Sequence, residues 1–515
     1  MNKRMLLAFI LAISLQTGRS QAPAILWQKP LGGSMMDDLR DVRAAPDGGF
    51  ILAGVSTSSD GDLSGNQGLY DAWIIRTDSL GSIVWQRSFG GSDYDGVNAV
   101  VPTADGGFAA AGYANSNDGD VTGQHGGGDG WVLKLDGAGT LLWQVALGGT
   151  LADNFFDLEQ TSDGGFIVVG ESESNDGEVV GGHGLYDVWL VKLDSNGAIQ
   201  WQKPRGGSGT DRGRSVRTLP GGNYVFAGQT GSNNGDVTDL QGFWDAWVVE
   251  VDSTGEIVWE RTLGGSSTDG AGSICLTADG GSIMVGHASS NDEDVSGNHG
   301  GQDAWAVKLD NNGAIQWQRC LGGSLTEEAT AVREVDDGYM VSAMTYSNDG
   351  DVTGMHGGFD AWVVMLDDNG DLVWQKAMGG NVGERANVVL PLTNGRLLVA
   401  GYAGSNNGDL TWSHGMQDGW LVVLGDSALA TSVVDPTFPH LLVHPNPATD
   451  RLNVLATNLP YGASVELLDA LGRSTLSAHM TSEPLALDVG ALPRGLYTLR
   501  IRWTAGSLCR LVVVE

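Results

Sequence analysis

Acidic residues recur two positions apart within segments that resemble Ser-Asn-Asp-Gly-Asp and that repeat along the chain. Oxygen ligands at this spacing around a glycine suit calcium. The same sequence also forms a turn held by side-chain-to-backbone hydrogen bonds, so a purely structural role is the alternative. Calcium is the one candidate cofactor, and its candidate ligands are Asp60, Asp62, Asp118, Asp120, Asp292, Asp294, Asp349 and Asp351.

Aromatic and basic residues form a second candidate group because they break an otherwise regular pattern. The residue directly before each recurring Asp-x-Trp triplet is aromatic in four copies, Tyr70, Tyr186, Trp244 and Phe359, and is glycine or glutamine in the others. Trp412 replaces a loop glycine. Arg212 and Arg214 lie at the start of the fourth repeat. Exposed rings beside carboxylates and amides suit stacking on sugars. Packing of each ring against its own loop is the alternative, and the candidate ligand-binding residues are these seven.

Two further series recur once per repeat. A position before the triplet holds a histidine in five copies and Gln67 or Gln241 in the other two. Because glutamine replaces histidine in two copies, this position is not expected to be an obligatory metal ligand. We expect the histidines to form hydrogen bonds within their own loops. The acidic series Asp37, Asp95, Asp153, Asp211, Asp269, Glu327 and Glu384 follows a Gly-Gly turn. We expect these residues to cap loops within their own repeats, because seven unpaired buried carboxylates would repel one another.

Catalysis is not expected. Residues present in every repeat share one environment, whereas acid–base chemistry needs carboxylates whose environments differ. The sequence shows no nucleophile elbow, zinc signature or phosphate loop at a persuasive spacing. The interpretation is therefore a binding protein, not an enzyme.

These residues belong to a repeat that organises most of the chain. The pattern W-Q-x-x-x-G-G, with Glu260 in place of the glutamine in the fifth copy, begins at Trp27, Trp85, Trp143, Trp201, Trp259, Trp317 and Trp374, spaced by 58 residues five times and then by 57. The second repeat contains four strand-like runs joined by glycine-containing turns, around 97–102, 108–113, 130–135 and 140–146. Four antiparallel strands per unit is typical of a propeller blade.

The ends of the array indicate a closed ring. The seventh unit lacks a fourth strand, and the segment from Ala24 to Pro30 carries the matching W-Q-K pattern at the N-terminus. We expect this segment to complete the last blade, since closure removes exposed strand edges. The prediction is an all-β fold: a seven-bladed β-propeller over residues 23–425, with both long loops of each blade on one face.

These repeats resemble the SBBP-like beta-propeller repeat family over residues 23–425. The D-x-x-G-x-x-x-W turn, as in Asp78, Gly81 and Trp85, is similar to the tryptophan-docking turn of quinoprotein propellers. Both resemblances imply a fold and neither implies an activity, because propellers host many unrelated functions.

A different module follows a proline-containing linker over residues 426–440. Residues 441–515 carry Pro-Asn-Pro, Asp-Ala-Leu-Gly-Arg and Leu-Pro-Arg-Gly-Leu-Tyr motifs between short alternating strands, which indicates a small Ig-like β-sandwich. These motifs resemble the type A sorting domain (Por type) of type IX secretion substrates in Bacteroidetes. The resemblance implies recognition by the type IX secretion machinery and a location outside the cell, secreted or at the outer-membrane surface.

The N-terminus and the composition agree with export. Lys3 and Arg4 precede an apolar run, and a small-x-small site ends near Ala22, so residues 1–22 are interpreted as a signal peptide; no transmembrane segment is expected. Only three cysteines occur, which excludes a disulfide framework. The net charge of -34 repels phosphate backbones, so nucleic acid is not expected as a partner, whereas cations, cationic surfaces and neutral glycans stay open. An acidic exterior that only keeps a secreted protein in solution is the alternative.

Three hypotheses follow from these observations. The first is a secreted or cell-surface propeller that binds a glycan or a protein, or mediates adhesion, through its long-loop face. The second is an extracellular polysaccharide hydrolase or lyase that uses residues around Arg212 and Trp244. The third is a structural component of the cell surface without a discrete ligand.

Overall fold

The computed structural model describes residues 22–46, 48–410, 413–426, 440–444, 451–457, 464–469, 473–479, 485–503 and 506–514. The predicted signal peptide, most of the linker and the candidate Trp412 lie outside the described residues. The chain divides into two compact units, residues 1–426 and 427–515. No helix in the described ranges is long and apolar enough to cross a bilayer, the one helical element being the three-residue 3-10 turn η1 (Thr393–Gly395).

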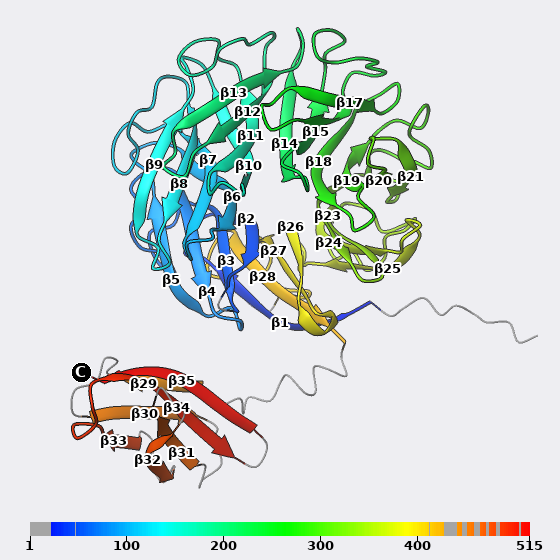
Figure 1. Ribbon diagram of the computed structural model, residues 1–515. Helices are drawn as coiled ribbons and strands as arrows, with labels where there is room; N and C mark the ends of the chain where they lie inside the picture. Colours follow the sequence, from blue (N-terminus) through cyan, green and yellow to red (C-terminus); the bar gives the residue numbers. More distant parts are fainter. Residues whose placement is uncertain are drawn as a thin grey trace, which may run out of the picture. The chain divides into compact units, whose positions relative to one another are not determined.

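The first unit contains seven four-stranded antiparallel sheets arranged around an open centre (Figure 1). Blade 1 consists of β2 (Asp37–Ala44), β3 (Phe50–Ser56), β4 (Asp71–Thr77) and β5 (Ile83–Phe89). Blade 2 consists of β6 (Asp95–Pro102), β7 (Phe108–Ala114), β8 (Asp129–Leu135) and β9 (Leu141–Leu147). Blade 3 consists of β10 (Asp153–Gln160), β11 (Phe166–Ser172), β12 (Asp187–Leu193) and β13 (Ile199–Arg205). Blade 4 consists of β14 (Asp211–Thr218), β15 (Tyr224–Thr230), β16 (Asp245–Val251) and β17 (Ile257–Leu263).

The remaining three blades follow the same order from the centre outward. Blade 5 consists of β18 (Asp269–Leu276), β19 (Ser282–Ala288), β20 (Asp303–Leu309) and β21 (Ile315–Leu321). Blade 6 consists of β22 (Glu327–Val335), β23 (Gly338–Thr345), β24 (Asp360–Leu366) and β25 (Leu372–Met378). Blade 7 consists of β26 (Glu384–Pro391), β27 (Leu397–Ala403), β28 (Asp418–Gly425) and β1 (Ala24–Leu31).

The N-terminal strand β1 closes the ring, as the sequence predicts. It pairs antiparallel with β28, and Lys29 lies opposite Leu421. Gln28 accepts a hydrogen bond from the Trp420 indole N–H at 2.9 Å, and Gln144 does the same for Trp131 within blade 2 at 2.7 Å. The displaced strand therefore makes the contact that a fourth strand makes in a continuous blade.

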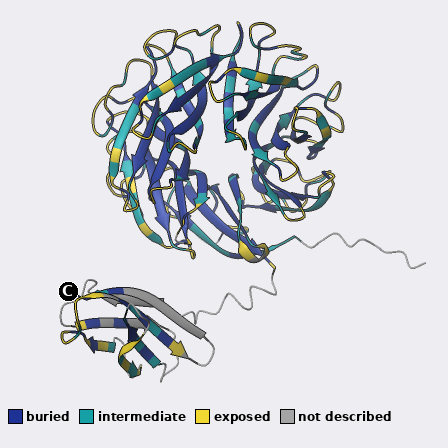
Figure 2. Cartoon of the chain, in the orientation of Figure 1, coloured by how far each residue is buried: buried dark blue, intermediate teal, exposed yellow. Residues whose placement is uncertain are grey.

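Two sets of tryptophans join the blades. The triplet tryptophans on each third strand are buried in the apolar layers between the sheets (Figure 2): Trp73, Trp131, Trp189, Trp247, Trp305, Trp362 and Trp420. The outer-strand tryptophans lie on the turn of the next blade. The Trp85 indole N–H donates to the Gly137 carbonyl at 3.2 Å, beside Gly139, whose φ of 79° suits glycine. This geometry agrees with the tryptophan-docking turn that the sequence resembles.

Each innermost strand contains a β-bulge at the same position. The pairing of β2 with β3 shifts between Leu39 and Asp41, which leaves Arg40 as the extra residue. Gly54 lies opposite the bulge, where a Cβ atom would come within 1.8 Å of the Asp38 carbonyl oxygen. Bulges redirect side chains, and here the extra residue of every blade lines the centre of the ring.

The second unit contains two antiparallel sheets around one apolar core. One sheet pairs β29 (His440–His444), β30 (Arg451–Thr457) and β33 (Leu485–Asp488). The other pairs β32 (Ser474–His479), β31 (Ser464–Leu468), β34 (Gly495–Trp503) and β35 (Gly506–Val514). Leu452 and Leu487 from the first sheet pack with Val465 and Leu499 from the second, so the unit is a β-sandwich.

We predict that removing Ala24–Leu31 destabilises the first unit and promotes self-association. Leu26 and Leu31 are buried in the closing strand, and losing their burial costs about 3–6 kcal/mol. The deletion also leaves β28 with an unpaired edge. Thermal unfolding and size-exclusion chromatography measure the two effects. A variant lacking residues 427–515 is the control, and an equal loss in both variants, or no loss in the first, would contradict closure by β1.

Candidate functional site

The predicted calcium ligands hold the loops of one face in place. The Asp60 carboxylate accepts the Ser34 N–H at 2.7 Å, and Asp118 accepts the Ser92 N–H at 2.7 Å. Asp292 and Asp349 accept the equivalent bonds from Ser266 and Ser324, both at 2.8 Å. Each aspartate thus joins the loop between the second and third strands to the Gly-Gly crossover segment that leads into its own blade.

The second acidic residue of each pair contacts the same crossover. Asp62, Asp120 and Asp351 lie within 3.2–3.3 Å of the backbone N–H groups of Gly32, Gly90 and Gly322. The Asp294 N–H donates to the Gly264 carbonyl at 3.1 Å. Within the described ranges, no group of three or more His, Cys, Asp or Glu side chains is arranged to hold a metal ion. Calcium binding by these loops stays a prediction.

The acidic series that opens each inner strand is buried and bonded within its own blade. Asp37 accepts hydrogen bonds from the Gly33 N–H at 2.7 Å, from the Ser58 hydroxyl at 2.9 Å and from the Ser56 hydroxyl. Burial raises the pKa of Asp37, and the three donors oppose that rise. These carboxylates cap loops, as expected.

The histidine series connects neighbouring blades as well as its own loop. His125 Nδ1 lies 2.7 Å from Asp129 of the same blade, and His125 Nε2 lies 3.7 Å from Glu178 of the next. Gln67, which replaces histidine in blade 1, donates to Asp120 of blade 2 at 2.7 Å. Sequence reasoning predicts the bond inside the loop and misses the contact across the blade junction.

The triplet aspartates carry an unsatisfied oxygen. Oδ1 of Asp71, Asp129, Asp187, Asp245, Asp303, Asp360 and Asp418 is buried without a hydrogen-bond partner among the described residues. Burial raises the pKa of Asp71 and of Asp245 to about 6, and the neighbouring Asp95 and Asp269 add to it. Gln67 and Gln241 stand beside these two, where the other blades have histidine.

The four predicted aromatic residues that precede the triplet lie at blade junctions, where each forms a parallel bridge to the crossover of the next blade: Tyr70, Tyr186, Trp244 and Phe359. Tyr70 lies against Tyr94 with ring centroids 5.3 Å apart, and Phe359 lies against Tyr346 at 5.2 Å. Both rings therefore contact other aromatic rings of the loop face. Tyr186 and Trp244 behave differently, because they flank a cation.

Arg212, Tyr186 and Trp244 form one cluster, as their common deviation from the repeat suggests. The Arg212 guanidinium lies 5.6 Å from the centroid of each ring, and its Nε lies 2.8 Å from the Glu171 carboxylate. Cation–π contacts on two sides hold the arginine in place. The second predicted arginine, Arg214, lies elsewhere, in the central channel.

An apolar rim, which sequence reasoning misses, occupies the same face. Its exposed members stand at the blade junctions, on the crossovers or just before the aromatic slots, and their exposed fractions run from 38% for Met36 to 78% for Phe243. At least one lies at each of the seven junctions: Met35, Met36 and Met416; Leu69 and Tyr94; Leu151; Leu185; Phe243; Leu325; and Val382. Apolar residues that recur on the crossovers and just before the aromatic positions are the sequence signal that could have identified the apolar rim.

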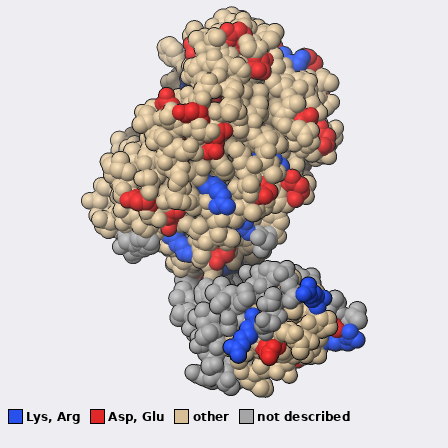
Figure 3. All heavy atoms as spheres, turned by 90° about the vertical axis from the view of Figure 1, so that its left-hand side faces the viewer, with Lys and Arg blue, Asp and Glu red and all other residues tan. Residues whose placement is uncertain are grey.

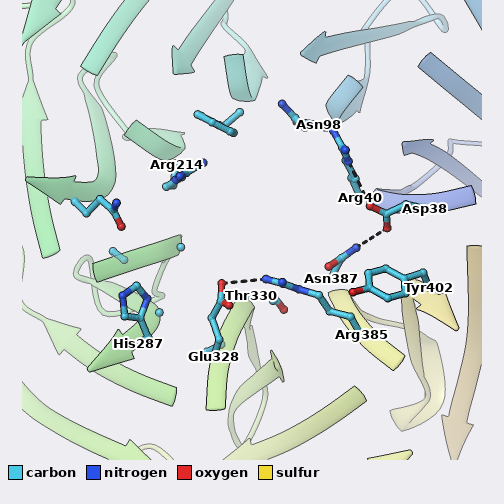
Figure 4. Close-up of a pocket in the computed structure, with 16 residues that line it drawn as sticks. Asp38, Arg40, Asn98, Arg214, His287, Glu328, Thr330, Arg385, Asn387 and Tyr402 are labelled. Atoms are coloured by element: carbon cyan, nitrogen blue, oxygen red, sulfur yellow. Dashed lines mark hydrogen bonds and ion pairs between the residues drawn. The ribbon is translucent and has the colours of Figure 1, made fainter. Parts of the chain in front are cut away.

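The central channel holds a cavity of about 580 Å³ (Figure 4). The seven bulged residues line it: Arg40, Asn98, Phe156, Arg214, Gly272, Thr330 and Asn387. The residue type at this position differs between every pair of neighbouring blades, so the channel wall does not follow the sequence repeat. A position of the inner strand whose residue type varies from copy to copy is the sequence signal that could have indicated the channel.

Acidic residues of the channel wall are paired with arginines. Glu328 lies 2.9 Å from Arg385, and Asp38 lies 3.4 Å from Arg40 and accepts a hydrogen bond from Asn387 at 3.0 Å. Figure 4 shows these side chains directed toward the channel centre, with Arg214 on the other side and joined to none of them.

Comparisons with known proteins identify the second unit. Residues 442–515 match the model of the secretion system C-terminal sorting domain. The chain is therefore a β-propeller that carries a type IX sorting domain and is exported to the cell surface or the extracellular space.

Relatives of the propeller are distant. The regulatory protein FlaEY of Caulobacter vibrioides is 27% identical over 191 residues, which is 33% of this chain and 19% of that protein. The chain thus matches well under two thirds of the relative's length.

Similar solved structures have low sequence identity to this chain. PorZ, an essential surface component of the type-IX secretion system of Porphyromonas gingivalis, is 11% identical, with a TM-score of 0.39 over 94% of this chain and 60% of that one. A puromycin hydrolase is 16% identical, with a TM-score of 0.42 over 84% and 60%. Drosophila semaphorin 1b is 10% identical, with a TM-score of 0.41 over 79% and 87%. The architecture of this chain rests on its own strand pairing.

We predict that Asp245→Asn stabilises the protein at neutral pH. The native Asp245 carboxyl binds a proton with a pKa of about 6, against 3.8 ordinarily, so the free energy of unfolding falls as pH rises from about 4 to about 6. An amide removes this titration and places a donor toward Asp269. We expect the melting temperature to rise by about 1–2 °C at pH 7.5 and less at pH 4.

Asp303→Asn is the matched control for this substitution. His299 Nδ1 lies 2.7 Å from Asp303, so the amide weakens an existing pair and should not stabilise. A lower melting temperature for Asp245→Asn at pH 7.5, in calcium-free buffer, would refute the electrostatic account of these junctions. A stabilisation that appears only without calcium would favour a cation at the site.

Proposed function

We propose that this protein is an extracellular binding module whose long-loop face engages a protein or a glycan. The observation that carries the proposal is the apolar rim, which places exposed side chains at all seven blade junctions of one face. Exposed apolar side chains that gather on one face of a protein are typical of an interaction site. The sorting domain delivers this face to the outside of the cell, where such a partner is available.

The geometry of the loops supports binding through a preformed surface. The loop between the second and third strands of each blade is held to a crossover by a carboxylate or amide, and parallel bridges join six of the seven blade junctions in the described structure. A rigid surface loses little conformational entropy when it binds. On the side of the propeller drawn in Figure 3, acidic and some basic side chains are dispersed among uncharged residues.

We favour binding over catalysis because the carboxylates of the loops and of the channel already have hydrogen-bond or arginine partners. Loop carboxylates accept backbone N–H bonds, and Asp38, Asp157 and Glu328 of the channel lie beside arginines. General acid–base catalysis needs carboxyl groups free to exchange protons with a substrate. The aromatic cluster around Arg212 is the part of this face that suits a sugar ring.

Substitution of the rim tests the proposal. We expect Leu185→Ser combined with Phe243→Ser to weaken partner capture at least about tenfold, because truncation of central apolar contacts in an interface costs more than about 1 kcal/mol. Val84→Ser combined with Val258→Ser is the control, since both valines are exposed on outer strands β5 and β17. The measurements are a glycan array and a pull-down from cell-surface extract, each with and without calcium.

Two results would count against the proposal. One is an equal loss of capture in the rim and control variants, which would place binding away from the loop face. The other is a blank array together with an empty pull-down. New reducing ends or unsaturated products from polysaccharide panels would instead favour a hydrolase or lyase.

A further inference from the structure

The central channel is basic, although the protein as a whole is strongly acidic. The cavity of about 580 Å³ continues into one of about 110 Å³, and all seven bulged residues line both. The two linings contain six arginines, Arg40, Arg43, Arg214, Arg217, Arg333 and Arg385, against four carboxylates, Asp38, Asp41, Asp157 and Glu328. The protein has 28 basic residues and a net charge of -34, so this excess of cations is local to the channel.

Arg214 is a guanidinium without a carboxylate partner. Its Cζ lies 4.0 Å from the centroid of the Phe156 ring, and no hydrogen bond or ion pair to it is found among the described residues. Burial lowers the pKa of Arg214, and the charges of Glu171 and Glu328 oppose that change. The Phe156 ring holds the guanidinium plane and leaves its N–H donors available to the channel.

A second unpaired guanidinium lies toward the tight-turn end of the channel. Arg217 lies 2.6 Å from Asp157, and Arg43 lies 3.3 Å from Asp41. Arg333 has no carboxylate within 4.0 Å in the described ranges and donates only to its neighbour, the Val332 carbonyl, at 2.8 Å. Burial, with Arg43 and Arg217 adding to it, lowers the pKa of Arg333 to about 10. Arg217 also lies 3.7 Å from Glu159, so the carboxylates of this group pair with Arg43 and Arg217 and none lies within 4.0 Å of Arg333 in the described ranges.

We propose that the central channel is a binding site for an oxyanion, the carboxylate or phosphate group of a small ligand, with Arg214 and Arg333 as its principal donors. Guanidinium groups bind both oxyanions through paired N–H donors. The larger cavity has the volume of a small-molecule pocket, and Gln229, His287 and Thr330 supply polar groups around Arg214 for the rest of the ligand. The site uses none of the apolar rim, so it stands independently of the proposed function.

Calorimetric titration of the full chain tests the site with three probes: inorganic phosphate, galacturonate and uncharged galactose. We expect at least one of the charged probes to bind and galactose not to bind. A comparison of the titrations with phosphate and with galacturonate tells whether the site binds a phosphate or a carboxylate group. Arg214→Gln should weaken binding about tenfold or more, because a charge-assisted hydrogen bond is lost.

Arg319→Gln is the matched control for the titrations, because Arg319 lies on outer strand β21 and pairs with Asp371 at 3.0 Å. Its affinity should equal that of the unmodified chain. The proposal fails if neither charged probe binds at millimolar concentration, if galactose binds as well as galacturonate, or if Arg214→Gln and Arg319→Gln have the same affinity.

Stability gives a second test that needs no ligand. In buffer without oxyanions, Arg333→Gln should raise the melting temperature by about 1–2 °C, because it removes an uncompensated charge from a crowded channel. Arg217→Gln should lower it, because Asp157 then loses its closest partner. Added phosphate should raise the melting temperature of the unmodified chain more than that of Arg333→Gln. The reverse order in either comparison would overturn the assignment of Arg333.

Discussion

The pairing of β1 with β28 is the constraint on which the rest of the propeller depends. The last blade reaches four strands only through a strand from the other end of the unit, and this pairing joins the two ends of the ring. Hydrogen bonds along β1 and the Gln28–Trp420 contact join the termini of the repeat array. The closed ring in turn fixes the inner strands around one channel and the crossovers on one face.

Closure leaves one irregularity at the seam. In the other blades an outer-strand tryptophan lies on the turn between the third and fourth strands of the following blade, as Trp317 lies beside Gly370. Blade 7 has no such turn, because its third and fourth strands come from opposite ends of the unit. Trp374 accordingly lines a described cavity of about 520 Å³. The same break that supplies the closing strand therefore removes one docking contact.

The architecture was predictable because it depends on residues that repeat. Period, strand number, closure and loop face all follow from tryptophans, glycines and turn aspartates at fixed spacing. The cluster of Arg212 with Tyr186 and Trp244 was also predictable in part, since all three break the pattern. The channel lining was not predictable, because a β-bulge decides which residue of each inner strand faces the channel. Strand alternation alone does not tell whether Arg40 and its equivalents face the channel or a neighbouring blade.

The distribution of charge separates the structural from the functional positions. Many carboxylates occupy repeated positions, where they accept hydrogen bonds from backbone N–H groups and hydroxyls. These structural carboxylates contribute to the net charge of -34. Arginines of the channel occupy positions that differ from blade to blade, and two of them lack a carboxylate in the described structure. A repeat constrained only by folding would fill such positions with small or neutral residues, because uncompensated guanidinium groups repel one another across a narrow channel. Their presence at the centre of an acidic ring is the strongest sign that this channel is built around something negatively charged.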